Sequence, residues 1–341
     1  MKRHIKKIIT IALCMSMMQP ALQATPFGEF CRKWVSRATN VAYWGILGAP
    51  IIGAGKGLVQ IHEIREVING IDKDGNPNFS ELKHDKPELY REINTILVQE
   101  GLSSLDSHKI KVLPMSSYDT LGSLYLTVQQ SPHTAADGTI LVTETWLNNH
   151  SAEVAAAVLA HESVHADEKH SYKNNASKTV MPFAVHGLYR ALMPAKEKYP
   201  SVVRSLARIP GAVGISLAST AAWIYNMKAC EREADRIVKP SAKLSRSLGS
   251  FIDPSHVAEK DFEARVRSDW KLLQTEKPKA DYPISFKIGY LMANAMNESQ
   301  FVAFGKNFAF ARLHPLPSER IAYLEQWAKE AEAKKQQEAN K

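Results

Sequence analysis

The stretch Ala160-His161-Glu162-Ser163-Val164-His165 constrains this chain most, because it is an HExxH motif. Two histidines four positions apart on a helix lie on one face, about one turn from each other. Their imidazole nitrogens can then bind a single zinc ion. The glutamate between them can take a proton from a water at the metal, which makes that water a nucleophile near neutral pH. The motif predicts a catalytic site with His161 and His165 as zinc ligands and Glu162 as general base.

The residues around the motif predict a helix over 152–170, with Ser151 as its N-cap and Glu153 in its first turn. The helix is rich in Ala, Val and Leu before the motif and polar after it. The two histidines therefore lie where the buried part of the helix is expected to reach the protein surface. This context favours a catalytic zinc site over a structural zinc site or a chance pair of surface histidines.

Residues 1–24 have the three regions of a secretory signal. Lys2, Arg3, Lys6 and Lys7 precede an eleven-residue apolar run over 8–18, and Ala24 ends a cleavage site. The alternative is a segment that stays as a membrane anchor. Because the segment carries four basic and no acidic residues, its removal lowers the net charge from +8 to +4. We therefore predict an exported protein, periplasmic or membrane-associated, and no nucleic-acid partner.

The rest of the chain divides into three predicted parts. A hydrophobic segment and a turn-rich loop occupy residues 25–86, the main domain occupies 87–330, and a charged tail that frays into solvent occupies 331–341. Cys31 and Cys230 remain after export, and their pairing stays open, because a small buried thiol at Cys230 is the alternative.

The segment before the motif predicts a helix over 87–100 with Pro87 in its first turn. Strand candidates follow at Ile110–Leu113, Ser123–Val128 and Thr139–Thr143, which predict a small antiparallel sheet beside the zinc helix. If the last strand is an edge strand, its backbone can pair with an extended peptide over the zinc, and otherwise it only supports the helix. Helices are expected at 255–271, 284–297 and 317–332, the last with an apolar face at Leu324 and Trp327.

A catalytic zinc site takes three protein ligands. A metzincin would have glycine and histidine at the positions of Glu168 and Ser171, and an inverted motif is absent. The third ligand is therefore expected on a later helix, where Glu231 and Asp235 lie four positions apart on one face. One of them can bind zinc while the other anchors a ligand histidine. Glu233 points elsewhere and is expected to be solvated.

Three motifs together resemble the HtpX-like and CAAX-prenyl-protease-like zinc metallopeptidases of the gluzincin group. They are HESVH at 161–165, EREAD at 231–235 and HPLPSER at 314–320, and the resemblance covers roughly residues 87–330. It implies a zinc metallopeptidase domain over this range. The chain departs from the family before the sheet edge, where Ser131-Pro132-His133 replaces the frequent Asn-Ala-aromatic segment.

The resemblance also implies roles for individual residues. His161, His165 and Glu231 would bind one zinc ion, and Glu162 would act as general base and then as general acid. The remaining roles fall on three residues. Asp235 would orient the first histidine, Arg320 resembles the arginine that ends the third motif, and His314 resembles a histidine that steadies the oxyanion or occupies the cleft. For His314 the alternative is a residue that only precedes Pro315 at a helix start.

Two uncharged stretches, 38–55 and 209–227, raise the question of membrane contact. A single span at 209–227 would put Glu231 across the membrane from His165, and no second stretch in between is long enough to span. We therefore expect a buried helix or a surface that rests on a membrane, with peripheral contact through 38–55 or 209–227. This favours the exported, BepA-like branch of the family.

Together these observations predict an α+β, mainly helical, zincin-like fold. We expect a zinc-dependent endopeptidase that acts outside the cytoplasm on proteins or peptides, and the resemblance suggests misfolded envelope proteins. One alternative is an envelope chaperone or assembly factor with an occluded zinc site. Another is a processing protease with one specific substrate.

Overall fold

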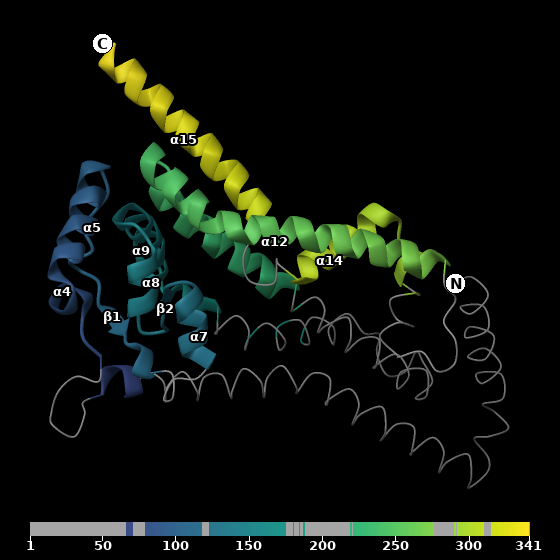
Figure 1. The fold of residues 1–341 in the computed structure, drawn as a ribbon, viewed down its shortest axis with the longest axis horizontal. Helices are drawn as coiled ribbons and strands as arrows, with labels where there is room; N and C mark the ends of the chain where they lie inside the picture. Colours follow the sequence, from purple (N-terminus) through teal and green to yellow (C-terminus); the bar gives the residue numbers. More distant parts are fainter. Residues whose placement is uncertain are drawn as a thin grey trace, which may run out of the picture. The chain divides into compact units, whose positions relative to one another are not determined.

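The computed structural model describes residues 66–70, 79–117, 123–174, 221–275, 292–309 and 315–340, with a few isolated positions. Almost all of them belong to one compact unit, formed by 60–174 and 224–341. Figure 1 shows its elements: α4 (Leu82–Asp85), α5 (Pro87–Gln99), β1 (Ile110–Leu113), α7 (Ser123–Gln130), β2 (His133–Thr134), β3 (Ile140–Thr143), α8 (Glu144–Asn149), α9 (Ala152–Asp167), α12 (Ala242–Thr275), α14 (Glu298–Ala309) and α15 (Pro317–Ala339). The segments 1–24 and 38–55 and most of 209–227 lie outside the described residues.

The predicted class is confirmed: the described residues are mainly helical, with a small sheet against α9. The sheet is mixed, however, and not antiparallel. Its order is β1-β3-β2, with β1 parallel to β3 and β2 antiparallel to it. The strand directly before the zinc helix, β3, is therefore central, and the edge strand near α9 is the two-residue β2. Strand order depends on tertiary pairing, which the sequence pattern does not encode.

The strand predicted at Ser123–Val128 is wrong, because this segment is the helix α7. Its apolar residues alternate, but they do not share one buried face: Val128 is buried, whereas Leu126 is 47% exposed. A short apolar run fits either period, and packing against β3 and α8 decides between them. The turn that precedes β3 is as predicted, since Gly138 has a φ of 87°.

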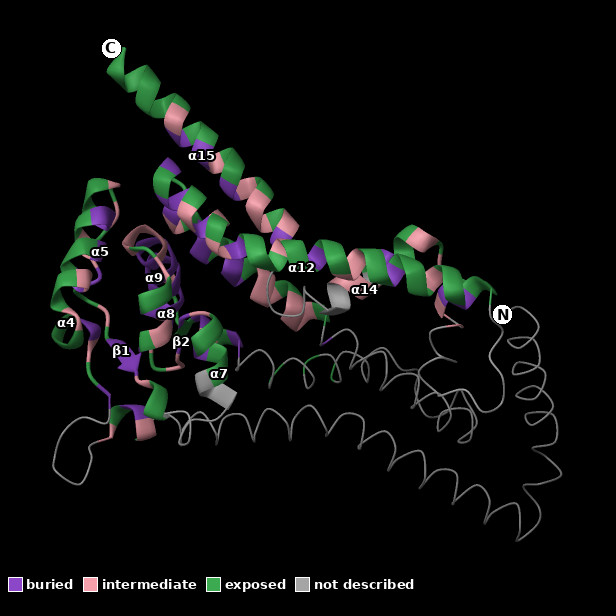
Figure 2. Cartoon of the chain, in the orientation of Figure 1, coloured by how far each residue is buried: buried purple, intermediate pink, exposed green. Residues whose placement is uncertain are grey.

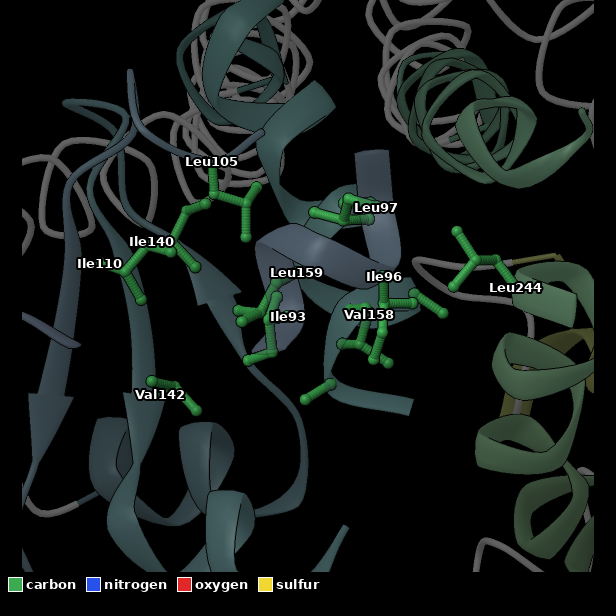
Figure 3. Packing of buried hydrophobic residues seen from close by; sticks show 14 of the residues in the cluster. Ile93, Ile96, Leu97, Leu105, Ile110, Ile140, Val142, Val158, Leu159 and Leu244 are labelled. Carbon is green, nitrogen blue, oxygen red and sulfur yellow. The ribbon is translucent and has the colours of Figure 1, made fainter. Parts of the chain in front are cut away.

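The core surrounds α9. Ser151 caps this helix, because its side chain accepts a hydrogen bond from Val154 N at 3.4 Å. Residues 155–163 are all buried, so the helix has no solvent-facing side along this stretch. It packs against α5, α12 and the sheet. Figure 3 shows this core, in which Val158 and Leu159 of α9 lie near Ile93 and Ile96 of α5. The apolar packing fixes the position of the motif one turn further along.

Two of the later helices, α12 and α15, extend beyond the predicted ranges. The helix expected at 255–271 is the second half of α12, which passes through Pro254. Burial of Leu244, Leu248 and Ile252 holds the first half in place, and this outweighs the hydrogen bond that proline cannot make. In the helix predicted at 284–297, residue 290 and residues 292–295 are helical, and most of the remaining range lies outside the described residues. α14 follows from Glu298.

α15 continues to Ala339, so the tail from 331 does not fray as predicted. The tail is rich in Ala, Glu, Lys and Gln, which favour helix without tertiary contacts. Figure 2 shows the change along α15, whose buried residues near Leu324 and Ala328 give way to an exposed end. Among the described residues, no helix is long and apolar enough to cross a membrane.

Candidate active site

Two helices bring together three residues that could hold a metal ion. α9 supplies His161 and His165, and a helix over residues 224–235 supplies Glu231. The Nε2 atoms of the two histidines are 3.1 Å apart. Glu231 Oε2 lies 3.5 Å from His161 Nε2, and Glu231 Oε1 lies 3.4 Å from His165 Nε2. All three side chains are buried, so their ligand atoms converge on one point inside the protein.

These residues fit zinc. Tetrahedral zinc holds nitrogen and oxygen ligands at about 2.0–2.1 Å, which places neighbouring ligand atoms about 3.3 Å apart. The two imidazole nitrogens lie 3.1 Å apart, and each lies 3.4–3.5 Å from a different oxygen of Glu231, which is close to that spacing. Two imidazoles and one carboxylate are also a donor set of catalytic zinc sites, which keep a fourth position open for water or substrate.

Asp235 supports the first histidine. Its Oδ1 lies 2.9 Å from His161 Nδ1, and the carboxylate is fully buried. Arg320, in the first turn of α15, donates from Nε to Oδ2 at 2.9 Å and from Nη2 to Oδ1 at 2.6 Å. The Tyr323 hydroxyl also donates to Oδ2. Burial alone would raise the pKa of Asp235, but Arg320 and His161 outweigh burial and hold this pKa well below its usual range. Asp235 is therefore a charged anchor that turns Nε2 of His161 toward the metal position.

His161 is strongly basic when no metal is bound. Burial lowers its pKa, but the hydrogen bonds and charges of Asp235 and Glu231 outweigh burial and raise the pKa to about 10. Near neutral pH the ring therefore carries a proton on each nitrogen in the metal-free protein. A metal ion has to displace the proton on Nε2 when it binds.

Glu162 lies beside the metal position, with its Oε1 4.0 Å from His161 Nε2. Its other oxygen, Oε2, accepts a hydrogen bond from Thr134 Oγ1 at 2.7 Å. Thr134 belongs to the edge strand β2, and its own carbonyl accepts a hydrogen bond from Ser171 Oγ at 2.9 Å. The carboxylate is thus held at one oxygen, while the other lies nearest the metal position.

The second histidine is supported differently. His165 Nδ1 lies 2.9 Å from His170 Nδ1, and His170 Nε2 lies 3.2 Å from Glu233 Oε2. Burial lowers the pKa of His170, and the nearby His165 acts in the same direction. Glu233 is partly solvated as expected, with its side chain 54% exposed, but it also contacts this histidine.

A cleft of about 200 Å³ opens onto these side chains. His133 and Thr134 of β2 line one part of it, and Val158, Leu248 and Phe251 give it an apolar part. The cleft therefore combines a sheet edge, the carboxylate of Glu162 and an apolar surface.

The structure brings most of the predicted site residues together: His161, Glu162, His165, Glu231, Asp235 and Arg320 all meet here. His314 lies outside the described residues. Cys31 also lies outside them, so its pairing with Cys230 stays open, while Cys230 is a buried thiol as the alternative expected. Tyr323 was not predicted, although its spacing of three from Arg320 puts both on one helix face. Thr134 was not predicted either, and the sequence holds no signal for it, because its contact with Glu162 depends on the sheet edge.

One comparison with known proteins gives a match. The family model described as peptidase family M48 matches residues 133–328, a range that begins at β2 and ends within α15. No curated protein and no solved structure matches the chain.

Proposed function

This chain belongs to peptidase family M48, and we propose that it is a zinc-dependent endopeptidase that acts outside the cytoplasm. The observation that carries the proposal is the convergence of His161, His165 and Glu231 on one point, with ligand atoms 3.1–3.5 Å apart. When bound there, zinc supplies a Lewis acid for the scissile carbonyl and lowers the pKa of the attacking water toward neutrality.

Glu162 is the proton carrier of the reaction. It takes a proton from the water that attacks the peptide carbonyl, and then gives this proton to the amine that leaves when the C–N bond breaks. Its Oε1, 4.0 Å from His161 Nε2, is the oxygen nearer to the metal position, and this oxygen accepts and returns the proton. Thr134 holds the other oxygen by its 2.7 Å hydrogen bond, so the carboxylate stays oriented between the two proton transfers.

The substrate is an extended segment of a protein or peptide. β2 is the edge of the sheet, and its Thr134 contacts Glu162, so a strand paired with this edge would pass beside the general base. An apolar side chain of that segment would fit against Val158, Leu248 and Phe251 in the cleft. His314 would assist by stabilising the oxyanion.

Action outside the cytoplasm rests on the signal pattern of residues 1–24. The stretches 38–55 and 209–227 would let the protein rest on a membrane. Misfolded envelope proteins are the proposed clients, because such proteins expose the extended apolar segments that this cleft would accept.

Casein digestion tests the proposal. Purified protein is incubated with casein, with and without a chelator, beside Glu162→Gln and the control Glu153→Gln. Glu153 lies on the same helix, is partly exposed and pairs with Lys243 at 3.4 Å, so Glu153→Gln shows whether a Glu-to-Gln change elsewhere on α9 affects digestion. We expect about one zinc per chain in all three proteins. Digestion should be lost with the chelator and in Glu162→Gln, and kept in Glu153→Gln.

Two results would contradict the proposal: undiminished digestion by Glu162→Gln, or wild-type protein that binds no zinc. Zinc binding without any casein digestion would instead indicate a protease restricted to one substrate or an occluded site. Digestion of a native partner would then separate these two.

A further inference from the structure

The two histidines of the proposed zinc site are supported by different groups. Behind His161 lies a carboxylate, Asp235, at 2.9 Å from Nδ1. Behind His165 lies a second imidazole: His170 Nδ1 is 2.9 Å from His165 Nδ1, and a carboxylate, Glu233, follows only beyond it, 3.2 Å from His170 Nε2. His170 is 2% exposed, so this middle ring is closed off from water.

The positions of the protons follow from the zinc site. A neutral imidazole that binds a metal through Nε2 carries its proton on Nδ1. His165 therefore donates from Nδ1, and His170 Nδ1 has to accept. A neutral His170 that accepts at Nδ1 carries its proton on Nε2, where the Glu233 carboxylate accepts it. Each of the two contacts then has one donor and one acceptor, and no other neutral arrangement achieves this.

On this basis, which rests on the proposed function, we infer that His170 and Glu233 act as positioning residues for His165. We call His165, His170 and Glu233 the histidine relay. The relay fixes the tautomer and the ring orientation of the second zinc ligand, and so strengthens zinc binding. Neither His170 nor Glu233 is one of the three residues that converge on the metal position.

The backbone conformation at the end of α9 makes the contact between His165 and His170 possible. α9 ends at Asp167, Lys169 adopts a positive φ of 53°, and helix resumes at His170. Five positions along an unbroken helix correspond to a rotation of about 140° away from His165. The turn at Lys169 brings His170 back to it. A left-handed conformation is unfavourable for a non-glycine residue, and such strain is typical of functional sites.

The residues around His170 could instead form a second cation site. Ligand atoms of Glu168, His170 and Glu233 lie within 4.8 Å of one another and could hold a second cation. One observation disfavours this reading: the Glu168 carboxylate is already paired with Lys173 Nζ, at 3.0 Å.

Zinc release to an excess of a chromogenic chelator tests the relay, because it does not depend on proteolysis. His170→Leu removes both hydrogen bonds, whereas the amide of His170→Asn retains an oxygen to accept from His165. Glu233→Gln changes only an exposed side chain and leaves folding intact. Glu168→Gln is the matched control, since Glu168 has similar exposure but does not contact His170.

We expect zinc to be held about 10- to 100-fold more weakly in His170→Leu than in wild type. His170→Asn should lie between the two, and Glu233→Gln should weaken binding by a smaller factor. Glu168→Gln should behave as wild type. In cobalt-substituted protein, the visible absorption bands should shift in His170→Leu, because His165 is no longer held in one orientation, and should return toward wild type in His170→Asn.

Wild-type zinc retention and cobalt spectra in His170→Leu would overturn the relay, and so would zinc binding in His170→Asn that is as weak as in His170→Leu. If Glu168→Gln weakened binding as much as Glu233→Gln, or wild type bound two cations per chain, the second-cation reading would replace it. Wild-type protein that binds no zinc would instead refute the proposed function. The outcomes for the two proposals are therefore distinguishable.

Discussion

Arg320 holds Asp235 in a two-point contact, with hydrogen bonds of 2.9 and 2.6 Å from its guanidinium to the two carboxylate oxygens. Asp235 in turn lies 2.9 Å from the Nδ1 atom of His161. The start of α15 is thereby connected to the first proposed zinc ligand through a single buried carboxylate. Several expected outcomes depend on this connection and on the groups around it.

Removal of Arg320 should destabilise the protein strongly. Arg320→Ala leaves the buried Asp235 charge without its partner, which costs about 3–5 kcal/mol of unfolding free energy. Arg320→Lys should lose less, because one hydrogen bond can be kept but not the paired geometry. Chemical unfolding of the metal-free protein measures both. Arg232→Ala is the control, because Arg232 is half exposed and pairs with Glu319 only at 3.6 Å. Equal unfolding midpoints for Arg320→Ala and Arg232→Ala would argue against this role.

Thr134→Val should slow catalysis without loss of zinc. The substitution keeps the shape of the side chain but removes the hydroxyl that lies 2.7 Å from Glu162 Oε2 and 2.9 Å from the Glu162 carbonyl oxygen. A hydrogen bond to a charged group contributes about 1.5–3 kcal/mol, so we expect kcat to fall at least about tenfold, with KM little changed. Thr134→Ser retains the hydroxyl and should restore most of kcat. Steady-state kinetics on a peptide substrate measures kcat and KM of both variants. If kcat fell as far in Thr134→Ser as in Thr134→Val, the hydroxyl would not be responsible for the effect.

Zinc binding should release a proton from His161. In the metal-free protein Asp235 and Glu231 overcome burial and raise the pKa of His161 from 6.5 to about 10. Below pH 10 zinc competes with this proton, so zinc affinity should rise about tenfold per pH unit across the neutral range. Calorimetry in buffers of different ionisation enthalpy counts the protons released. Asp235→Asn should reduce the count, and an unchanged count would contradict the assignment.

The same raised pKa predicts the pH dependence of stability without metal. The folded state holds the His161 proton more tightly than the unfolded state, so this stabilisation is complete below pH 6.5 and is lost as pH rises toward 10. The unfolding midpoint of the chelator-treated protein should therefore fall across this window. A midpoint that rises over the same range would exclude the effect.

Glu259 should anchor the start of α15. Its buried carboxylate accepts hydrogen bonds from the Ser318 amide and hydroxyl, both at 2.9 Å, and lies 2.8 Å from Lys306 Nζ. Burial raises the pKa of Glu259, but Lys306 and Ser318 outweigh burial and lower it, so its stabilisation is lost as pH falls below 4.5. Glu259→Ala should cost about 3–5 kcal/mol. Glu263 is a more exposed carboxylate that also contacts Lys306, so Glu263→Gln is the control. Its free energy of unfolding should fall much less. A loss of similar size in both variants would contradict the anchor.

Two glycine substitutions should have opposite signs. Gly138 has a φ of 87°, so Gly138→Ala forces a left-handed conformation and should cost about 1 kcal/mol. Gly249 lies inside α12 with open space around it, so Gly249→Ala should stabilise by up to about 1 kcal/mol. Thermal melts of the two variants should shift in opposite directions. A stabilising Gly138→Ala would show that the turn before β3 adopts another conformation.

Those parts of the protein that follow from local periodicity could be predicted from the amino-acid sequence. The spacing of His161 and His165 on an alanine-rich helix, the Ser151 cap and the four-residue spacing of Glu231 and Asp235 are all helical regularities. Each holds in the structure because a helix places residues i and i+4 on one face whatever surrounds it. The apolar face of Leu324 and Trp327 on α15 has the same origin.

Tertiary structure alone decided which strands pair, where α7 replaces a strand, and which side chains meet across elements. Thr134 reaches Glu162 because β2, and not β3, forms the sheet edge beside α9. His170 reaches His165 because Lys169 leaves the helical conformation. Such contacts join residues through backbone turns and pairings that carry no periodic signal, so their energies enter only when the whole unit packs.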